Sequence, residues 1–215
     1  KQIRRERYVR RLILKGDEKK MAIVFHKESR CFHLYNAEVS YIIRIMENEQ
    51  LEQLYYGKRI HDREDFTYLH EECMRSQMSI NVPEPGILSM QYTKQEFPTY
   101  GTGDYRSPAL TIAQENGSRI VNFTYAFHEI YNGKKNILPL PATYVESGDE
   151  AQTLEITLHD AVMDTDLILS YTIYEEYPVI TRNAKVSHNG SEKIVLDKIM
   201  SASVEFNDMD YEMVQ

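Results

Sequence analysis

The chain has 215 residues, of which 42% are hydrophobic and 27% charged, a composition typical of a globular domain that can bury a substantial core. Its two cysteines, Cys31 and Cys73, have no spacing that predicts a disulfide framework or a zinc site, which favours a reducing cytoplasm. Since neither a membrane-spanning apolar run nor a secretory leader is recognisable, the sequence predicts a cytoplasmic protein without a membrane partner.

The net charge of -8 is unevenly distributed along the chain. Residues 1–20 carry nine Lys or Arg and three acidic residues, a net charge of +6, whereas residues 21–215 carry sixteen basic and thirty acidic residues, a net charge of -14. An acidic body lacks the clustered positive field that a nucleic-acid groove requires, so we expect no nucleic-acid partner.

Residues 1–20 form a basic leader with a ragged apolar side. Such a leader could be an arm that binds nucleic acid or an anionic membrane, or a basic arm that recruits a partner. We favour a third hypothesis, in which Met21 is the true start and the leader is translated upstream DNA, because KGD at residues 15–17 can be encoded by a purine-rich ribosome-binding sequence. We therefore expect residues 1–20 not to be native and residues 21–215 to form the domain.

Short segments rich in aromatic and β-branched residues begin at Met21. AIVFHK, RCFHLYN and VSYIIRIME occupy residues 22–27, 30–36 and 39–47, and the polar breaks between them predict an opening β-meander. Residues 51–60, LEQLYYGKRI, fit both a short helix and a strand, and we favour the strand.

Residues 61–86 are polar and acidic and end with two prolines, which predicts a long excursion from the sheet. Loops longer than about 12–15 residues in a compact domain are usually functional or disordered, so this one is a candidate for contact with a partner. Its histidines, His61 and His70, and its acidic residues lack a metal-ligand spacing, and a solvated acidic loop is the better interpretation. We expect no metal and no other cofactor.

Residues 95–110, QEFPTYGTGDYRSPAL, combine turn formers, aromatic residues and two opposite charges. Two prolines and two glycines do not fit one helix or one central strand, so the stretch predicts a shaped loop. Asp104 and Arg106 point to the same side of an extended backbone and can pair or jointly face a polar partner. We favour an ion pair that braces the loop over a ligand contact.

The sequence after the loop predicts β-strands throughout. Residues 110–114 are expected to form a strand, and Asn116 and Gly117 the turn of a hairpin whose long returning strand covers residues 120–131. His128 on that strand is interpreted as a half-buried cross-strand residue rather than a base. Further strands are expected at residues 153–158, 167–174, 179–186 and 194–206. Together these segments predict an all-β domain, a large antiparallel sandwich.

Sequence motifs for catalysis are not found in the chain. It has no glycine-rich phosphate loop, no nucleophile elbow and no HExxH, and acidic residues alone do not identify a glycosidase pair, which requires a particular separation in space. The residues alone therefore predict an all-β domain of unknown role.

Several blocks in order resemble the amino-terminal domain of bacterial α-galactosidases of glycoside hydrolase family 36. The blocks are EFPTYGTGDYRSPAL at 96–110, ENGSRIVNFTYAFHEIYNGK at 115–134, LPLPATYVE at 138–146 and LSYTIYEEYPVITRNAKVSHNG at 169–190. Upstream, FHLYNAEVSYIIRIMENEQLEQLYYGKRI at 32–60 resembles the opening strands of that family. The resemblance covers about residues 21–215.

The resemblance implies a β-supersandwich of the galactose-mutarotase-like type, truncated before the (β/α)₈ catalytic barrel that follows it in the intact enzyme. Such enzymes are retaining glycosidases with two aspartates on the barrel. This chain has no counterpart of their lysine-tryptophan-aspartate motif and contains no tryptophan. We therefore expect no catalytic residue here, and a parent enzyme that hydrolyses terminal α-galactosides of the melibiose and raffinose type.

In family members of this kind the amino-terminal domain packs on the barrel and, in tetramers, contributes loops to a neighbouring active site. The resemblance implies three partners: the chain's own barrel, further copies in a homo-oligomer, and an α-galactoside bound by the parent enzyme. Arg75, Asp104 and Arg106 are expected near substrate or at a subunit interface. An uncovered barrel-facing side should expose apolar surface or a strand edge, so we expect the chain alone to self-associate.

A stand-alone carbohydrate-binding β-sandwich is the alternative. Sixteen tyrosines could supply aromatic platforms for a sugar. Their spread over nearly all the expected strands favours use in the core and at interfaces instead.

Overall fold

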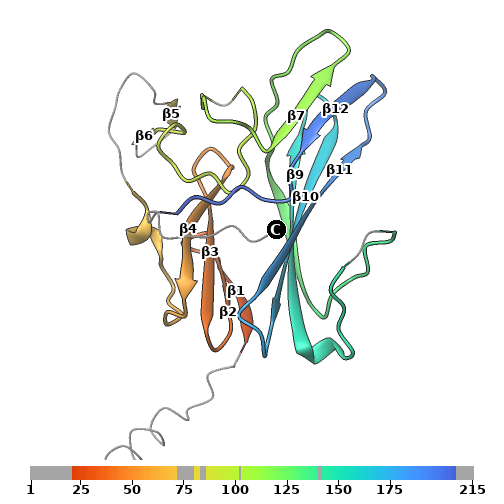
Figure 1. The fold of residues 1–215 in the computed structure, drawn as a ribbon. Helices are drawn as coiled ribbons and strands as arrows, with labels where there is room; N and C mark the ends of the chain where they lie inside the picture. The colour runs from red at the N-terminus through yellow and green to blue at the C-terminus, as the bar shows by residue number, and fades with distance from the viewer. Residues whose placement is uncertain (1–20, 72–79, 83–85, 102, 140–141, 207–215) are drawn as a thin grey trace, which may run out of the picture.

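The computed structural model describes residues 21–71, 80–82, 86–101, 103–139 and 142–206 (Figure 1). Two four-stranded antiparallel sheets face each other in this structure, as the sequence predicts. The first sheet is a meander of strands in chain order: β1 (Ala22–His26), β2 (Cys31–Tyr35), β3 (Val39–Ile45) and β4 (Leu51–Lys58).

The second sheet has the order β11-β10-β9-β8. Its strands are β8 (Thr124–Asn132), β9 (Ala151–Asp160), β10 (Thr165–Tyr174) and β11 (Ile180–His188). Two further antiparallel pairs join β7 (Leu110–Gln114) to β12 (Ile194–Ile199) and β5 (Ile80–Val82) to β6 (Gly86–Leu88). Two short 3₁₀ helices, η1 and η3, are Thr67–Leu69 and Gly148–Glu150.

The described residues contain no α-helix. Within that part of the chain, no helix has the length and apolar character needed to cross a membrane.

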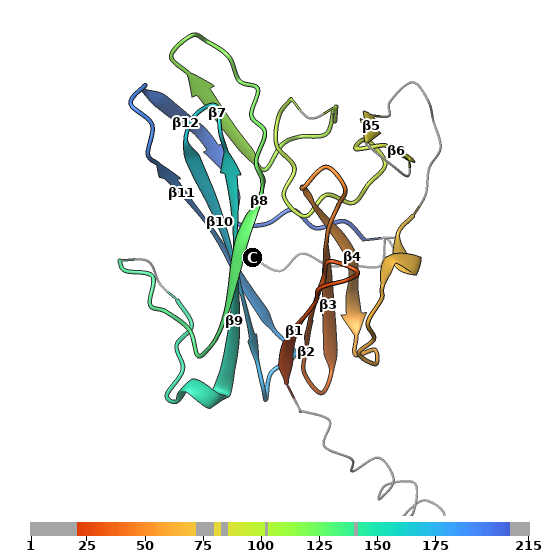
Figure 2. The ribbon, with the colours of Figure 1, turned by 180° about the vertical axis from the view of Figure 1, so that it is seen from behind.

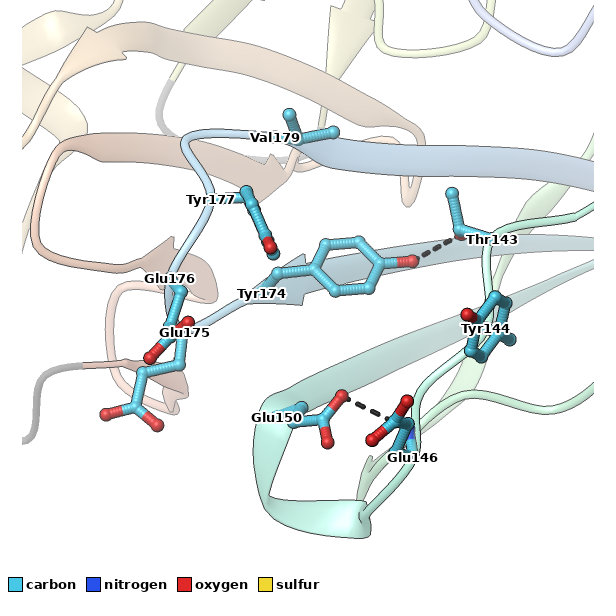
Figure 3. A pocket seen from close by; sticks show the side chains of 9 residues that line it. All are labelled: Thr143, Tyr144, Glu146, Glu150, Tyr174, Glu175, Glu176, Tyr177 and Val179. Carbon is cyan, nitrogen blue, oxygen red and sulfur yellow. Dashed lines mark hydrogen bonds between the residues drawn. The ribbon is translucent and has the colours of Figure 1, made fainter.

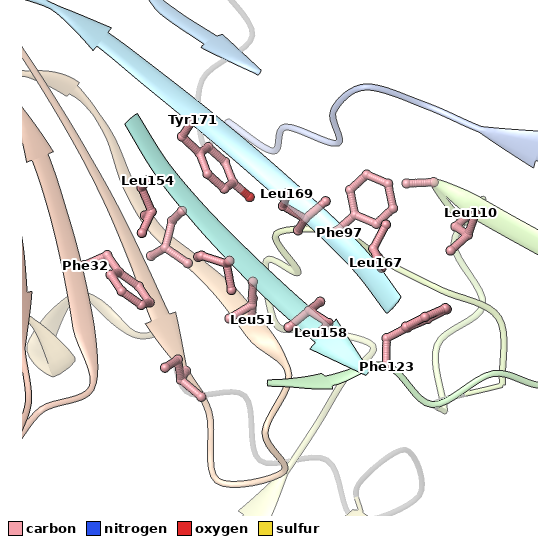
Figure 4. Packing of buried hydrophobic residues seen from close by; sticks show 14 of the residues in the cluster. Phe32, Leu51, Phe97, Leu110, Phe123, Leu154, Leu158, Leu167, Leu169 and Tyr171 are labelled. Atoms are coloured by element: carbon pink, nitrogen blue, oxygen red, sulfur yellow. The ribbon is translucent and has the colours of Figure 1, made fainter. Parts of the chain in front are cut away.

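The core lies between the two sheets, where alternate residues of each strand point inward (Figure 4). The inward residues stand directly opposite one another across neighbouring strands, so each pair shares one face. These pairs are Leu158 with Leu167, Ile156 with Leu169, Leu154 with Tyr171, Phe32 with Ile43 and Leu34 with Tyr41. Burial of these apolar rows is the main source of stability.

Residues 61–71 cover the outer face of the first sheet. Phe66 is fully buried against Cys31 and Ile42, and Asp62 accepts hydrogen bonds from that face as well. This part of the predicted excursion therefore packs back onto the sheet, because its aromatic ring and carboxylate find partners there. Arg75 lies outside the described residues.

The predicted hairpin around Gly117 is wrong. The turn itself forms, with φ of 84° at Gly117 and its N–H donating to the Gln114 carbonyl at 2.9 Å. However, β7 pairs with β12 and β8 pairs with β9, so the two strands flanking the turn are not neighbours (Figure 2). The reason lies in the connection, where Val121 and Phe123 are 2% exposed and insert into the core instead of extending a strand.

The remaining expected strands are confirmed, with one end corrected. Residues 51–60 contain β4, as favoured, but the last strand ends at Ile199 rather than Phe206. Beyond it the chain runs across to the first sheet, where the Phe206 ring lies 6.0 Å from that of Tyr56. Residues 200–206 therefore run from the β7–β12 pair to the first sheet instead of lengthening β12.

Candidate functional site

The stretch at residues 95–110 is a shaped loop, as predicted. Gly101 has φ of 107°, and a Cβ atom at this position would lie 2.6 Å from Ile120 Cγ2. The neighbouring Tyr100 carbonyl accepts a hydrogen bond from the Val121 N–H at 3.1 Å. Glycine is therefore required here both by backbone conformation and by close approach of the 118–123 connection.

Asp104 and Arg106 form the ion pair that the sequence favours. Arg106 Nε lies 2.7 Å from Asp104 Oδ2, and the Arg106 backbone N–H donates to Oδ1 at 3.1 Å. Gln95 Nε2 donates to the same carboxylate at 2.6 Å. Because the Asp104 side chain is only 2% exposed, these bonds replace the water that its charge has lost.

The Arg106 guanidinium also clamps the preceding turn. Its Nη2 donates to the carbonyl oxygens of Met90, Gln91 and Thr93 at 3.2, 2.9 and 2.8 Å. Its Nη1 pairs with the Glu205 carboxylate. Burial raises the pKa of Glu205, although the Arg106 charge opposes that shift. The guanidinium thus joins three separate segments, which is the role of a brace.

Glu96, in the same loop, is a buried carboxylate that our sequence analysis did not single out. It is fully buried and accepts hydrogen bonds from the hydroxyls of Tyr41, at 2.6 Å, and Tyr171, at 2.8 Å. Arg182 forms an ion pair with it. Burial raises the pKa of Glu96, while the Arg182 charge and the hydroxyl donors lower it.

These partners of Glu96 belong to β3, β10 and β11, so one carboxylate ties the loop to both sheets. A sequence signal for the cluster exists on β11. There, Ile180, Ala184 and Val186 pack against the core, and Arg182 occupies the same alternating face. A charged residue at an inward strand position predicts a buried partner.

A pocket of about 540 Å³ lies where β10 turns into β11, at the lower end of the sandwich in Figure 1. Figure 3 shows the Tyr174 ring at its centre, with Tyr177 on the hairpin side and Tyr144 on the side of the preceding loop. Its lining residues are Thr143, Tyr144, Glu146, Glu150, Tyr174, Glu175, Glu176, Tyr177 and Val179. No local sequence pattern predicts this pocket, because its two walls come from separate segments of the chain.

Both walls of the pocket are held by hydrogen bonds. Asn36 Nδ2 donates to the carbonyl oxygens of Tyr174 and Tyr177, at 2.8 Å each. The Glu175 N–H donates to the Glu150 carbonyl at 2.9 Å, which links the hairpin turn to the loop. Glu150 in turn caps η3 with its carboxylate. The pocket is therefore preformed, with aromatic faces and carboxylate acceptors.

Three histidines, His26, His33 and His70, lie close to carboxylates of the same domain. His26 Nε2 and His33 Nδ1 lie 2.8 and 2.7 Å from one Asp62 oxygen, and burial lowers the pKa of His33. His70 Nδ1 lies 2.5 Å from Glu52, and that hydrogen bond raises the pKa of His70. Within the described ranges, no group of three or more His, Cys, Asp or Glu residues could hold a metal ion.

His128 is half-buried on β8, as interpreted from the sequence. Its ring centroid lies 4.5 Å from Phe25 and 4.8 Å from Phe32, and its Nδ1 is 2.7 Å from the Tyr125 hydroxyl. Burial lowers the pKa of His128. This residue therefore packs the two sheets together.

The sequence profile of the glycosyl hydrolase family 36 N-terminal domain matches residues 49–215. The chain belongs to this family. The resemblance seen in the sequence blocks is thereby confirmed, and the antiparallel sandwich described above is the fold of this family 36 domain.

Relatives of the family 36 domain are whole enzymes. Alpha-galactosidase AgaA from Geobacillus stearothermophilus is 36% identical over 194 residues, covering 90% of this chain and 26% of AgaA. The crystal structure of alpha-galactosidase AgaB from the same organism superposes with a TM-score of 0.76 at 36% identity, covering 85% of this chain and 24% of AgaB. The crystal structure of an AgaA variant in complex with raffinose superposes with a TM-score of 0.75 at 37% identity, covering 84% of this chain and 25% of the variant. The chain spans about a quarter of the length of these relatives.

Proposed function

We propose that this chain is the non-catalytic amino-terminal domain of a retaining α-galactosidase that hydrolyses terminal α-galactosides of the melibiose and raffinose type. The observation that carries the proposal is the family 36 match over residues 49–215, with relatives that are alpha-galactosidases about four times as long. In this proposal the catalytic aspartates belong to a (β/α)₈ barrel outside the present chain, and the enzyme acts in the cytoplasm.

The proposed task of the domain is to support that barrel and a homo-oligomer, a tetramer by analogy with the resembling enzymes. Exposed apolar side chains on β12 and the segment after it support this role, because such surface is typical of an interface. These residues are Val195, Leu196, Ile199, Met200, Val204 and Phe206, with exposures between 38% and 58%. We expect the chain alone to self-associate in light scattering, and a monodisperse monomer would count against this role.

Arg75, Asp104 and Arg106 remain our proposed residues near substrate or at a subunit interface. The internal partners of Asp104 and Arg106 favour an indirect contribution, in which the pair holds the loop in shape beside a neighbouring surface.

A chimera tests the proposal, with residues 21–215 replacing the matching amino-terminal region of AgaA. We expect the chimera to release galactose from raffinose and the present chain alone to release none. The matched control is the same chimera with Glu96→Ala, which should lower the yield of folded enzyme, and not kcat/KM per folded molecule, because the buried cluster is broken. Hydrolysis by the chain alone contradicts a non-catalytic role, and a folded but inactive chimera contradicts the supporting role.

A further inference from the structure

We infer that the pocket between residues 143–150 and the β10–β11 turn binds the pyranose ring of a neutral sugar. This inference goes beyond the proposed function, since the lining residues of the pocket all lie in this domain and none of them belongs to the residues proposed near substrate or at a subunit interface. It assigns a sugar-binding site to the domain, separate from hydrolysis.

The size and stiffness of the pocket suit a small ligand. Its volume of about 540 Å³ lies in the range of roughly 300–1,000 Å³ typical of small-molecule sites. Asn36 fixes the hairpin wall through two carbonyl groups, and the bond from Glu175 to Glu150 fixes the loop wall. A ligand would therefore bind without having to order the backbone, so little binding energy is lost to ordering the site.

Tyrosine rings supply the apolar contact. Tyr144 and Tyr177 are 74% and 64% exposed, and Tyr174, at 8%, forms the floor between them (Figure 3). The Tyr174 hydroxyl is hydrogen-bonded to Thr143 Oγ1 at 2.5 Å, so the face of the Tyr174 ring is the part that can pack against a ligand. A pyranose has an apolar C–H face, which in galactose is widened by the axial hydroxyl, and flat rings offer matching area at low entropic cost.

Carboxylates on the rim supply acceptors for sugar hydroxyl groups. Glu146 and Glu176 are both exposed, one on each wall. Hydrogen bonds from hydroxyl donors to a carboxylate are stronger than neutral ones. Water screens these exposed charges, so ion pairing alone would hold a cation weakly, whereas a sugar can pack its C–H face on the rings and donate its hydroxyl groups to the carboxylates. The chemistry therefore favours a neutral polyhydroxylated ring.

The test is a titration of the full chain with galactose and with raffinose by calorimetry. We expect saturable binding with Kd on the order of 1 mM, as for a small ligand in an open pocket. Tyr144→Ala and Tyr177→Ala should each weaken binding about tenfold. Tyr68→Ala is the matched control, because Tyr68 is similarly exposed, at 61%, but lies on η1 away from the pocket. Circular dichroism checks that each variant is folded.

Two further probes separate a sugar from a cation. Glu176→Gln keeps a hydrogen-bonding group but removes the charge, so sugar binding should fall by no more than about threefold. Spermidine serves as the cationic probe. The inference is overturned by the absence of saturable sugar binding, by sugar binding that neither tyrosine change affects, or by binding of spermidine alone. If the chain binds sugar but the folded AgaA chimera is inactive, this inference is supported and the proposed function is contradicted.

Discussion

The loop at residues 95–110 and the pocket at the β10–β11 turn use charged and aromatic residues in opposite ways. In the loop, Glu96 and Asp104 are buried, and each is bonded to several groups of the same chain. Around the pocket, Tyr144 and Tyr177 face solvent, although Asn36 holds the backbone carbonyl of Tyr177. The difference teaches that the loop with conspicuous turn formers and opposite charges serves the fold, while the accessible surface of the pocket is made of residues that no sequence motif marks.

Energetics explains why the loop is so fully bonded. A carboxylate removed from water is tolerated only when ion pairs and hydrogen bonds replace its hydration. Glu96 has two hydroxyl donors and one guanidinium, and burial and the nearby Glu96 charge raise the pKa of Tyr41 and Tyr171 well above the usual value. Those hydroxyls therefore remain protonated at neutral pH and can donate to Glu96.

The largest effect is expected from Glu96→Ala. Removing the carboxylate leaves the Arg182 guanidinium buried without its partner, which should lower the free energy of unfolding by about 3–5 kcal/mol. Urea unfolding measures this loss in the free energy of unfolding. Glu146→Ala, an exposed glutamate at the pocket, should change the same quantity by less than about 0.5 kcal/mol. Equal losses for the two variants would break the contrast between the regions.

Arg106→Ala should have the next largest effect, a loss of about 2–3 kcal/mol, because Asp104 and three carbonyl groups lose a charged donor. Arg119→Ala is the control, since Arg119 is 54% exposed and its pair with Asp197 is worth at most about 1 kcal/mol. If Arg106→Ala lowers the free energy of unfolding no more than Arg119→Ala does, the bonds of Arg106 do not contribute to stability.

The pH dependence of stability near neutral pH should come from the buried His33 and the half-buried His70. Burial lowers the pKa of His33, so its contribution is present above about pH 6.5 and is lost as the pH falls below that value. The hydrogen bond to Glu52 raises the pKa of His70, so its contribution is present below about pH 6.5 and is lost as the pH rises through the folded-state value.

His70→Gln should therefore change the slope of stability against pH. With His70 removed, the fall in the free energy of unfolding expected above about pH 6.5 should disappear, by up to about 1.4 kcal/mol per unit of lost pKa shift, while the rise below that pH from His33 should stay. Urea unfolding at several pH values measures the slope. Glu176→Gln at the pocket should leave it unchanged, and an unaltered slope in His70→Gln would refute the assignment.

The smallest effect on stability is expected at the pocket. Tyr177→Ala should change the free energy of unfolding by less than about 0.5 kcal/mol, because the ring is 64% exposed and the wall is held through its backbone carbonyl. Thermal unfolding checks this. A drop of several degrees would mean that the ring supports the fold, and the comparison with the loop would then be weaker.

Local patterns in the sequence were sufficient for most of the fold but not for the pairing of strands. Alternation identified the strands, since apolar side chains of period two report burial on one face. The Asn116 and Gly117 turn formed as expected, yet turn chemistry specifies only the turn, and the partner of β7 was decided by core packing of Val121 and Phe123.

The sites were predicted less completely for the same reason. Asp104 and Arg106 are two residues apart, so their pairing was readable from spacing. Glu96 and Arg182 are 86 positions apart, and only the inward place of Arg182 on its strand hinted at a partner. The pocket joins residues of two distant turns and depends on Asn36 of a third segment, so no local pattern could predict it.

The central claim is that the charged residues of the loop hold the domain in shape and take no part in hydrolysis. The direct measurement is kcat/KM for raffinose and Tm of the AgaA chimera with and without Arg106→Ala. We predict that Tm falls by about 4–8 °C while kcat/KM per folded molecule stays within about threefold. A loss of kcat/KM of more than about 100-fold at unchanged Tm would contradict the claim and place Arg106 at the substrate.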